Sequence, residues 1–470
     1  MDTLWIVLGL LAAWVVVLFL LATTGRLAKW NLSLMLGIVL MVRTQKGKGI
    51  IEWVSKPRRF WNLVADAGLV VTLLGMVGMT ALFLWSATLA LRPDSGLQPL
   101  GVSEILVIPG VNPFVPLWYG LVALIVTLVV HEGGHGVLAR ANDMRLKSLG
   151  LLVAVVPVGA FVEPDEDDLK AASRRKRLRV FAAGPAVNLG VAALCLLAFS
   201  GLVGAASFTP GVPLAGVVAG APAAKAGLVG GDLLVGVDNR TLDDWGQFRA
   251  YLNTTHPGQL VLLSTSKGAM VHVALESRWD SFSPAEQQAI FAYNKTAQRY
   301  CSASVPAAAA SGGACAEALQ ALPFLGVRPL LPSDVSFLSH PFEQGGVGFL
   351  RLISLPIGEV RGSPILSTYL PAFHTAPGAP TAYWIATTMA FWLFWINLMV
   401  GLTNILPMLP LDGGHIFRDV AGGVVQRLRP GLPEARREQV VKRTATGVSL
   451  FILGAFLLQV AGPYLVRAFA

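Results

Sequence analysis

Six apolar stretches, each long enough to cross a bilayer, constrain the fold of this chain more than any other feature. A membrane-spanning helix needs about 20 apolar residues. The stretches cover approximately residues 4–22, 64–91, 116–139, 179–205, 382–406 and 446–468. Charged residues make up 13% of the chain, whereas an ordinary globular protein carries about 25%. We therefore expect a polytopic α-helical membrane protein with about six transmembrane helices.

Two apolar segments near the N-terminus need separate interpretation. The first stretch lacks a basic segment before it and a clear cleavage site, so we expect a retained anchor rather than a cleaved signal peptide. The run from Leu32 to Val42 is bracketed by Lys29 and Arg43. It is too short to span a bilayer, and we expect it to lie in the interface or to re-enter the membrane.

Basic residues gather in three segments and predict the orientation of the chain. Residues 23–62 hold 8 Lys and Arg, residues 140–179 hold 9 and residues 416–443 hold 7, out of 36 in all. The positive-inside rule places such segments in the cytoplasm, which puts both termini outside. The orientation of the chain and binding to anionic lipid headgroups account for these basic segments, so no nucleic-acid partner is needed.

The long outer loop, residues 206–381, contains the soluble part of the chain. Short β-type runs such as DLLVGVD and LVLLSTS alternate with Gly and Pro turns. This part, above all APAAKAGLVGGDLLVGVDN, resembles a PDZ domain, a fold that binds peptides by adding a strand to a sheet edge. A β domain that only packs on its own membrane part is the alternative. FLGVRPLL predicts a returning strand, and Cys301 and Cys315 could form a disulfide outside the cell.

The segment LIVTLVVHEGGHGVLAR, residues 124–140, places ionisable side chains in an apolar span. Residues i and i+4 share a helix face, so His131 and His135 can bind one metal ion, and Glu132 reaches the water to be activated. Two imidazoles, a carboxylate and an open position form a common hydrolytic zinc site with glutamate as general base. A polar seam between helices is the alternative, but ionisable residues within membranes usually serve function.

A third ligand is expected from NILPMLPLDGGH, residues 404–415. Pro407 and Pro410 break the helix, and broken helices at membrane depth line cavities or protein interiors. Asp412 would then be an acidic residue on irregular backbone and the third ligand of the metal. The alternative is that Asp412 caps the helix that follows.

These motifs together resemble the site-2 protease family of intramembrane zinc metalloproteases. The HExxH motif is present at His131–His135, and the later Asn-x-x-Pro-x-x-Pro-Leu-Asp-Gly motif at Asn404–Gly413. The resemblance implies that His131, His135 and Asp412 bind one Zn²⁺ and that Glu132 is the catalytic base. It also implies that Asn404 contacts the scissile region or the oxyanion.

Three further features extend the resemblance. Gly184, Pro185 and Asn188 match the family's Gly-Pro-x-x-Asn motif, for which we expect a role in helix packing and site support. LGLLVAVVPVGAFVEPD matches a membrane-dipping β segment that could hold a substrate extended. His415 is a weaker candidate ligand. The family features cover residues of about 116–210 and 382–415.

We expect the chain to be divided into five regions. They are a two-span N-terminal region at 1–115, a first half of the catalytic membrane core at 116–205, an extracytoplasmic PDZ-like α+β domain at 206–330 with an insertion at about 278–321, a juxtamembrane outer segment at 331–381, and a second half of the core at 382–470.

The expected function is that of an intramembrane zinc endopeptidase in regulated proteolysis. Its partners would be the lipid bilayer and transmembrane protein substrates already trimmed by another protease. His131 precedes Arg140 by nine residues, which at about 1.5 Å per residue places it roughly 13 Å inside the cytoplasmic boundary. The runner-up is a non-proteolytic membrane scaffold or chaperone that holds a structural zinc.

Overall fold

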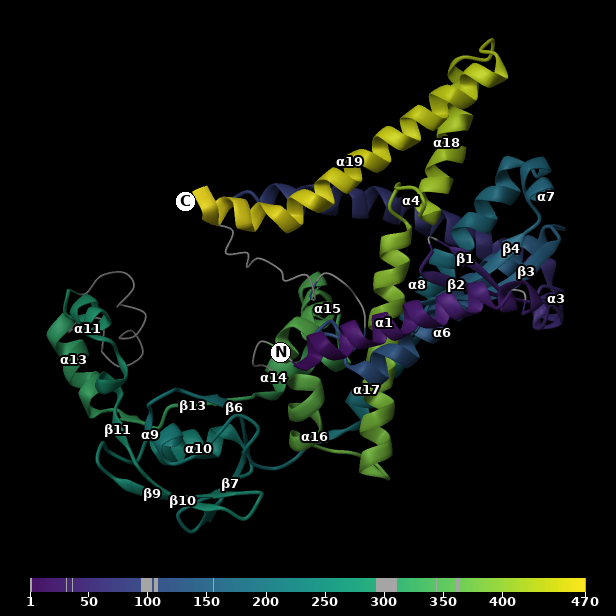
Figure 1. Cartoon of the computed structure of the whole chain (residues 1–470). Helices are drawn as coiled ribbons and strands as arrows, with labels where there is room; N and C mark the ends of the chain where they lie inside the picture. The colour runs from purple at the N-terminus through teal and green to yellow at the C-terminus, as the bar shows by residue number, and fades with distance from the viewer. Residues whose placement is uncertain are drawn as a thin grey trace. The chain divides into compact units, whose positions relative to one another are not determined.

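The computed structural model describes most of the chain and divides it into two compact units. Described are residues 2–30, 32–35, 37–93, 104, 109–154, 156–292, 311–343, 345–360 and 364–469. Unit 1 comprises Met1–Leu197 with Met389–Ala470, and unit 2 comprises Ala198–Thr388 (Figure 1). Each unit is described by itself.

Unit 1 is predominantly helical. Its helices are α1 (Asp2–Thr23), α2 (Arg26–Lys29), α3 (Lys48–Val54), α4 (Arg58–Leu89), α6 (Leu117–Ala141), α7 (Glu166–Ala171), α8 (Arg174–Ala205), α17 (Pro380–Asn404), α18 (Asp412–Leu428) and α19 (Glu434–Phe469), of which α8 and α17 continue into unit 2. Helices α18 and α19 pack side by side (Figure 1).

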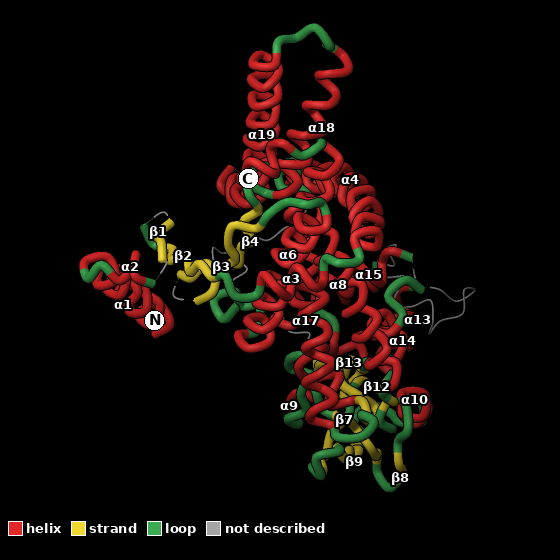
Figure 2. The backbone as a smooth tube through the Cα atoms, turned by 90° about the vertical axis from the view of Figure 1, so that its right-hand side faces the viewer, coloured by secondary structure: helices red, strands yellow, loops and turns green. Residues whose placement is uncertain are grey.

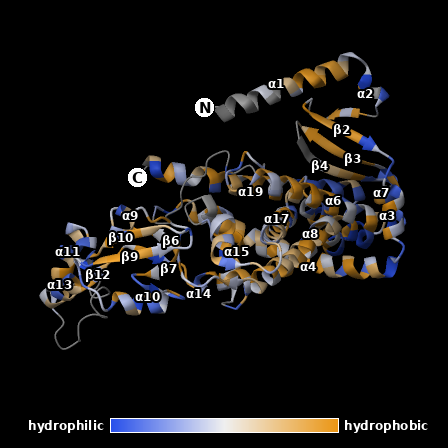
Figure 3. Ribbon diagram, turned by 90° about the horizontal axis from the view of Figure 1, so that it is seen from below, coloured by the Kyte–Doolittle hydropathy of each residue, from blue (hydrophilic) through white to orange (hydrophobic). Residues whose placement is uncertain are grey.

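Five helices in the described residues are long and apolar enough to cross a membrane. They are α4, α6, α8, α17 and α19, and apolar residues dominate the spanning helices (Figure 3). These five match the last five of the predicted spans. The first predicted span coincides with α1, a helix of 22 residues. Its passage through the membrane, and therefore the count of six, stays a prediction.

A four-stranded antiparallel sheet accompanies these helices. Its strands are β1 (Leu32–Met35), β2 (Val39–Thr44), β3 (Leu146–Ala154) and β4 (Val156–Pro164), in that order across the sheet (Figure 2). Strands β3 and β4 form from the segment predicted as a membrane-dipping β segment. Strands β1 and β2 form from the short apolar run, for which a hairpin was not predicted. The hairpin covers one side of β3, so β4 is an outer strand.

Helix α6 packs closely against helix α8. A Cβ on Gly134 of α6 would lie 3.1 Å from the Ala183 carbonyl oxygen of α8. Small residues at such positions let helix backbones approach closely in membranes. On the neighbouring helix α4, Asp66 accepts hydrogen bonds from the Arg179 guanidinium at 2.7 Å, which fixes the position of α8.

Unit 2 contains a second sheet with its own apolar core. Strands β6 (Val212–Val217), β7 (Leu233–Val237), β9 (Leu260–Thr265), β10 (Met270–Ala274) and β13 (Val327–Pro329) run in the order β10-β9-β7-β6-β13, and β8 (Arg240–Thr241) pairs with β7. Helices α9 (Pro222–Lys225) and α10 (Trp245–Leu252) accompany them. Phe248 of α10 is fully buried against the sheet. Strand β13 confirms the predicted returning strand.

The rest of unit 2 consists of short elements. These are β5 (Ser207–Phe208), β11 (Glu276–Ser277), η2 (Arg278–Ser281), α11 (Pro284–Phe291), α13 (Gly312–Ala321), β12 (Pro323–Phe324), α14 (Pro332–Ser339), α15 (Gly346–Val360), η4 (Ile365–Tyr369), α16 (Leu370–Phe373) and β14 (His374–Thr375). Strand β5 pairs with β14. Cys315 is disulfide-bonded. Cys301 lies outside the described residues, so the expected pair stays a prediction.

Candidate metal centre

Three ligand-type side chains converge in unit 1. The Nε2 atom of His131 lies 3.1 Å from Oδ2 of Asp412, and Nε2 of His135 lies 3.4 Å from the same oxygen. The two Nε2 atoms are 3.3 Å apart. The side chains are only 8%, 12% and 16% exposed, in the order His131, His135, Asp412. The sequence predicted this group of three residues, and the structure brings them together.

The distances among these atoms fit one tetrahedral ion. Zinc binds imidazole nitrogen and carboxylate oxygen at about 2.0–2.1 Å, so the ligand atoms of a tetrahedral site lie about 3.3–3.4 Å apart. The three observed separations agree with this value to within a few tenths of an ångström. Three protein ligands also leave the fourth position of a catalytic zinc site open. The donor set and its geometry therefore fit Zn²⁺.

The other nitrogen of each imidazole is also occupied. Nδ1 of His135 lies 2.7 Å from the Val180 carbonyl oxygen on α8, to which it donates. Nδ1 of His131 lies 3.0 Å from the side-chain amide of Asn188, also on α8. Such partners fix the tautomer and the ring orientation of metal-binding histidines. Both rings are therefore held with Nε2 directed at the shared site.

The amide of Asn188 carries a further signal. As placed, its nitrogen faces Nδ1 of His131, and its oxygen is buried without a hydrogen-bond partner. The two amide atoms are distinguished only by their hydrogen bonds. When Nε2 of His131 binds a metal, Nδ1 carries the proton and requires an acceptor. The side-chain oxygen of Asn188 provides one when the amide is flipped, and this orientation gives that oxygen the donor it lacks.

Gly184 leaves the space in which a metal would lie. A Cβ at this position would come within 2.4 Å of Nε2 of His135 and 2.6 Å of Nε2 of His131. Any other residue would therefore place an atom against both metal-facing nitrogens. The expected role of Gly184 in helix packing and site support stays a prediction. Gly184 and Asn188 are four residues apart and share a face of α8, which was a signal available in the sequence.

Pro185 follows at the next position inside α8. Proline lacks the N–H that would bond the carbonyl four residues earlier, at Phe181. The local break lies beside Val180, whose carbonyl accepts from His135. The supporting role expected of Pro185 stays a prediction.

The segment between α17 and α18 delivers Asp412. Helix α17 ends at Asn404, as the prolines at 407 and 410 predicted. Asp412 is the first residue of α18 rather than part of irregular backbone, and the N-cap Leu411 makes no side-chain capping bond. The helix-capping alternative for Asp412 is therefore wrong, because its carboxylate faces the two histidines. Gly413 permits the tight turn, since a Cβ there would lie 2.3 Å from the Leu406 carbonyl oxygen.

Two other predicted residues lie near this segment. Asn404 is half-buried at the end of α17. It shares a helix stripe with Gly401, which packs against Asn188 and Leu189 of α8. His415 is not part of the group of three; its ring stacks on Phe181 with centroids 5.0 Å apart. The structure thus gives His415 a packing contact rather than a place among the ligands.

Glu132 lies about 100° around α6 from His131. Its Oε2 accepts a hydrogen bond from the Val162 backbone N–H of β4 at 3.0 Å. This bond joins the predicted base to the outer strand of the sheet. Glu132 also lines a cavity of about 420 Å³ between α6 and the sheet. Sequence spacing predicted neither the partner strand nor the cavity.

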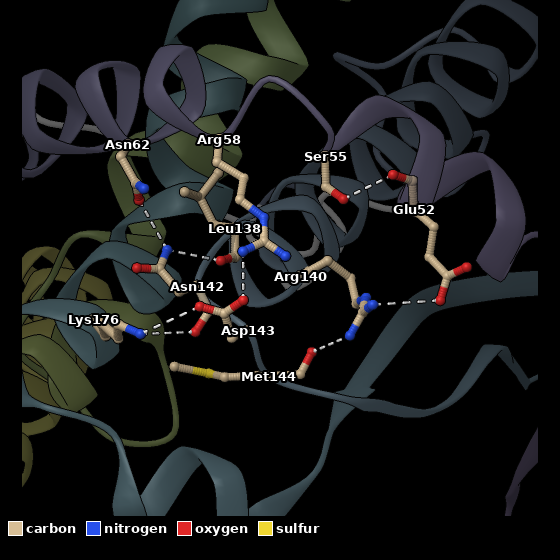
Figure 4. Close-up of polar contacts among 10 residues, drawn as sticks. All are labelled: Glu52, Ser55, Arg58, Asn62, Leu138, Arg140, Asn142, Asp143, Met144 and Lys176. Carbon is tan, nitrogen blue, oxygen red and sulfur yellow. Dashed lines mark hydrogen bonds and ion pairs between the residues drawn. The ribbon is translucent and has the colours of Figure 1, made fainter.

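Polar contacts fix the C-terminal end of α6 (Figure 4). The Asn142 side chain, 3% exposed, donates to the Leu138 carbonyl at 2.9 Å and to Asn62 of α4 at 3.0 Å. Asp143 accepts from Arg58 of α4 at 2.6 Å. These contacts join α6 to α4 just beyond the end of α6. They hold the register of the helix that carries both histidines.

Comparison with known proteins places this site in a family. An uncharacterized protein of Methanocaldococcus jannaschii is 27% identical over 92% of this chain and 89% of its own length. Zinc metalloprotease Rip1 of Mycobacterium tuberculosis is 26% identical over 67% of this chain and 86% of its own. Metalloprotease MmpA of Caulobacter vibrioides is 24% identical over 65% and 86%.

The family model extends across both halves of the site. Residues 119–452 match the model described as Peptidase family M50. This range includes both histidines, Glu132 and Asp412, and it covers more than half of the chain. The metal that these three ligands fit is accordingly zinc. The chain belongs to peptidase family M50, the site-2 protease family, and is a zinc metalloendopeptidase.

Proposed function

We propose that this protein hydrolyses peptide bonds within or near the transmembrane helices of membrane-protein substrates. His131, His135 and Asp412 would hold the zinc, and Glu132 would act as the base. One observation carries the proposal: two of the three metal-type ligands, His131 and His135, and the glutamate lie on α6, a helix apolar and long enough to cross a membrane. Ionisable residues at such positions generally serve function.

The residues around the site have distinct parts in the proposed reaction. Bound zinc supplies Lewis acidity that polarises a carbonyl and makes water a stronger nucleophile near neutral pH. The carboxylate of Glu132 takes the proton from the attacking water and passes it to the leaving amide nitrogen. The Val162 N–H binds Oε2 of Glu132 and leaves Oε1 free for this transfer. The side-chain amide of Asn404 would donate to the developing oxyanion.

Strand β4 provides an edge for the substrate backbone. In an antiparallel strand, successive residues direct their N–H and C=O groups to opposite sides. Because the Val162 N–H points to Glu132, the backbone groups of Ala160 point outward on the same side. An extended substrate could therefore pair along β4 beside the base. Such pairing would hold the peptide in the extended form that proteolysis requires.

The proposed orientation follows from the basic segments of the sequence. Both termini would be extracytoplasmic, and the zinc would lie within the membrane nearer the cytoplasm. The ionic contacts at the inner end of α6 support this placement, because Arg58, Arg140 and Asp143 gather there. Water would reach the site from the same side.

We assign substrate selection to unit 2. Its six-stranded sheet with α9 and α10 supports a PDZ-like domain. The pairing of β5 with β14 brings the two ends of the unit together, as expected of an insertion in a membrane core. Such a domain would admit substrates that another protease has already trimmed. The test compares cleavage of one transmembrane substrate with a long and a short outer segment: equal rates would remove this role.

The decisive experiment concerns Glu132. Purified wild-type protein and the Glu132→Gln variant are incubated with a model transmembrane substrate, and their zinc contents are measured. We expect the variant to retain zinc and to lose at least 100-fold in cleavage rate, since a positioned general base contributes about 10²–10⁴-fold. The control is Glu434→Gln at an exposed position of α19.

Two results would contradict the proposal. One is full cleavage by Glu132→Gln, which would remove the glutamate from the chemistry. The other is zinc-loaded wild-type protein that binds the substrate but does not cleave it. That result would favour a scaffold or chaperone with a structural zinc.

A further inference from the structure

The cavity beside Glu132 has walls from distant parts of the sequence. Its volume is about 420 Å³, and its lining comes from β2, α3, α6, β3 and β4. Among the described residues that line it, Glu132 alone carries a charge. An apolar cavity with one functional group is typical of a binding site for an apolar ligand.

One wall is a single face of the four-stranded sheet. Successive residues of a strand point to opposite faces, and the pairing puts Thr44 beside Leu149 and Leu149 beside Val162. The lining side chains on this face come from alternate positions of three strands: Val42, Thr44, Leu149, Leu151, Ala160 and Val162. The face is therefore continuous from β2 to the outer strand β4.

The facing wall is formed by two helices. Helix α3 contributes Ile50, Ile51 and Val54, and α6 contributes a stripe that includes Val129 and Glu132. Ile51 approaches α6 closely, because a Cβ on Gly136 would lie 3.0 Å from its Cδ1. Ile50 is 69% exposed and Val129 is 54% exposed. The cavity thus presents apolar side chains that the fold leaves uncovered.

The N-terminal part of this wall lies outside the family match, which begins at residue 119. It is nevertheless firmly attached. Strand β2 pairs with β3 from Leu40 to Thr44. The Lys48 ammonium donates to the carbonyls of Leu146 and Lys147 at 2.6 and 2.7 Å. The Trp61 indole donates to the Val54 carbonyl at 2.6 Å. Residues 39–54 are therefore a built wall of the site.

We propose that residues 39–54 complete a pocket for a bulky apolar side chain of the substrate, at a position next to the cleaved bond. This inference rests on the proposed function. A strand added to the edge of β4 continues the sheet, so its alternate side chains point to the same face as Ala160 and Val162. That face is one wall of the cavity, and Glu132 lines the same cavity beside β4. The occupant is thus a residue of the bound peptide.

The test uses substrates that differ at one side chain. Purified full-length protein cleaves model transmembrane substrates with Ala, Leu or Phe at each residue flanking the cleaved bond. At one flanking position we expect wild-type protein to prefer Leu and Phe over Ala on the order of 10-fold, as apolar pockets discriminate. Thr44→Phe, which narrows the cavity, should lower cleavage of the Phe substrate about 10-fold relative to the Ala substrate. Ile50→Ala should shift the preference towards Phe.

The control variant is Ile38→Phe. Ile38 is 57% exposed in the turn between β1 and β2 and does not line the cavity. It should leave the ratio of the three rates unchanged. Zinc content and cleavage of the Ala substrate report whether each variant is folded.

The outcomes separate this inference from the proposed function. If wild-type protein cleaves the substrates, Glu132→Gln does not, and Thr44→Phe and Ile50→Ala change all three rates by the same factor, the pocket is overturned while the protease stands. If the three cleavage rates change by the same factor and that factor depends on the lipid added, a lipid chain occupies the cavity. This result would also overturn the proposed pocket. The pocket is supported if Thr44→Phe and Ile50→Ala change the ratio of the cleavage rates of the three substrates and Ile38→Phe does not.

Discussion

Opposite sides of α6 differ in how closely they are packed. One side carries His131, Gly134 and His135, and packs against α8 so closely that a single Cβ at Gly184 would touch both metal-facing nitrogens. The other side carries Val129, Gly133 and Val137 and lines an open apolar cavity. A Cβ at Gly133 would meet no atom within 4 Å.

The difference indicates how one helix can combine two demands. Metal binding requires ligand atoms at fixed separations, and an added methyl group changes these. Binding of varied peptides requires room instead. Glu132 lies between the two sides, about 100° from His131 around a helix of 3.6 residues per turn. It can therefore serve both the metal side and the cavity side.

Gly184→Ala should prevent zinc binding on the histidine side of α6, and we expect it to have the largest effect. The new Cβ would lie 2.4 Å from Nε2 of His135. We expect near-complete loss of zinc and loss of cleavage by at least 100-fold, checked by metal analysis and a substrate assay. Gly190→Ala, on the same helix with nothing within 4 Å of the new Cβ, is the control. Normal zinc content in Gly184→Ala would refute the close approach.

Asn188 tests the support behind His131. Asn188→Ala should weaken zinc binding about 10–100-fold, which is typical for loss of a partner of a metal-binding histidine. Asn188→Asp should restore much of the affinity, because it keeps an oxygen acceptor for the Nδ1–H of His131. Chelator competition measures both values. Asn397→Ala, at another buried asparagine, is the control. If the Asn188→Asp variant bound zinc no better than the Asn188→Ala variant, the inferred amide orientation would be wrong.

Gly133→Ala applies the same small change to the cavity side of α6. Because nothing lies within 4 Å of the new Cβ, zinc content should stay normal and the free energy of unfolding should hardly change. Only KM should change, by a few-fold, as the methyl group enters the cavity. Steady-state kinetics with one substrate provides the measurement. Loss of zinc would mean that the two sides are not independent.

The smallest effect concerns an ion pair beyond the C-terminal end of α6. The Arg145 guanidinium beside Asp168 lowers the pKa of that carboxyl to about 2. An unfolded aspartate titrates near about 3.9, so the pair stabilises the fold fully above that pH and loses its effect as pH falls towards 2. Arg145→Gln should lower the midpoint temperature of unfolding slightly at pH 6 and by less at pH 2. A pH-independent difference would contradict this.

The chemistry of the site could be predicted from the sequence because it depends on local spacing. His131 and His135 are one helical turn apart, and Asp412 lies in a motif with two prolines. The position of Gly184 against both imidazoles depends instead on how α8 crosses α6. Spacing along one helix contains no information about that crossing.

The spanning helices could be predicted from the sequence, but the hairpin near the N-terminus could not. Long apolar runs marked the spanning helices, because the hydrocarbon thickness sets their length. The run from Leu32 to Val42 was too short for this argument, and short apolar runs do not distinguish a strand from other structures. Its pairing with β3 joins segments about 100 residues apart. That contact forms the cavity wall, which is why the purpose of the N-terminal region was not evident from the sequence.

The bond between the Val162 N–H and Glu132 has a consequence for where cleavage occurs. An outer strand offers a row of free backbone groups, and a bare row permits several alignments of an added chain. Here one donor of that row is already in use. An incoming peptide must therefore begin its pairing at Ala160, which fixes its alignment relative to the base. In the proposed mechanism, the carboxylate that takes the proton would therefore also determine which bond is presented to it.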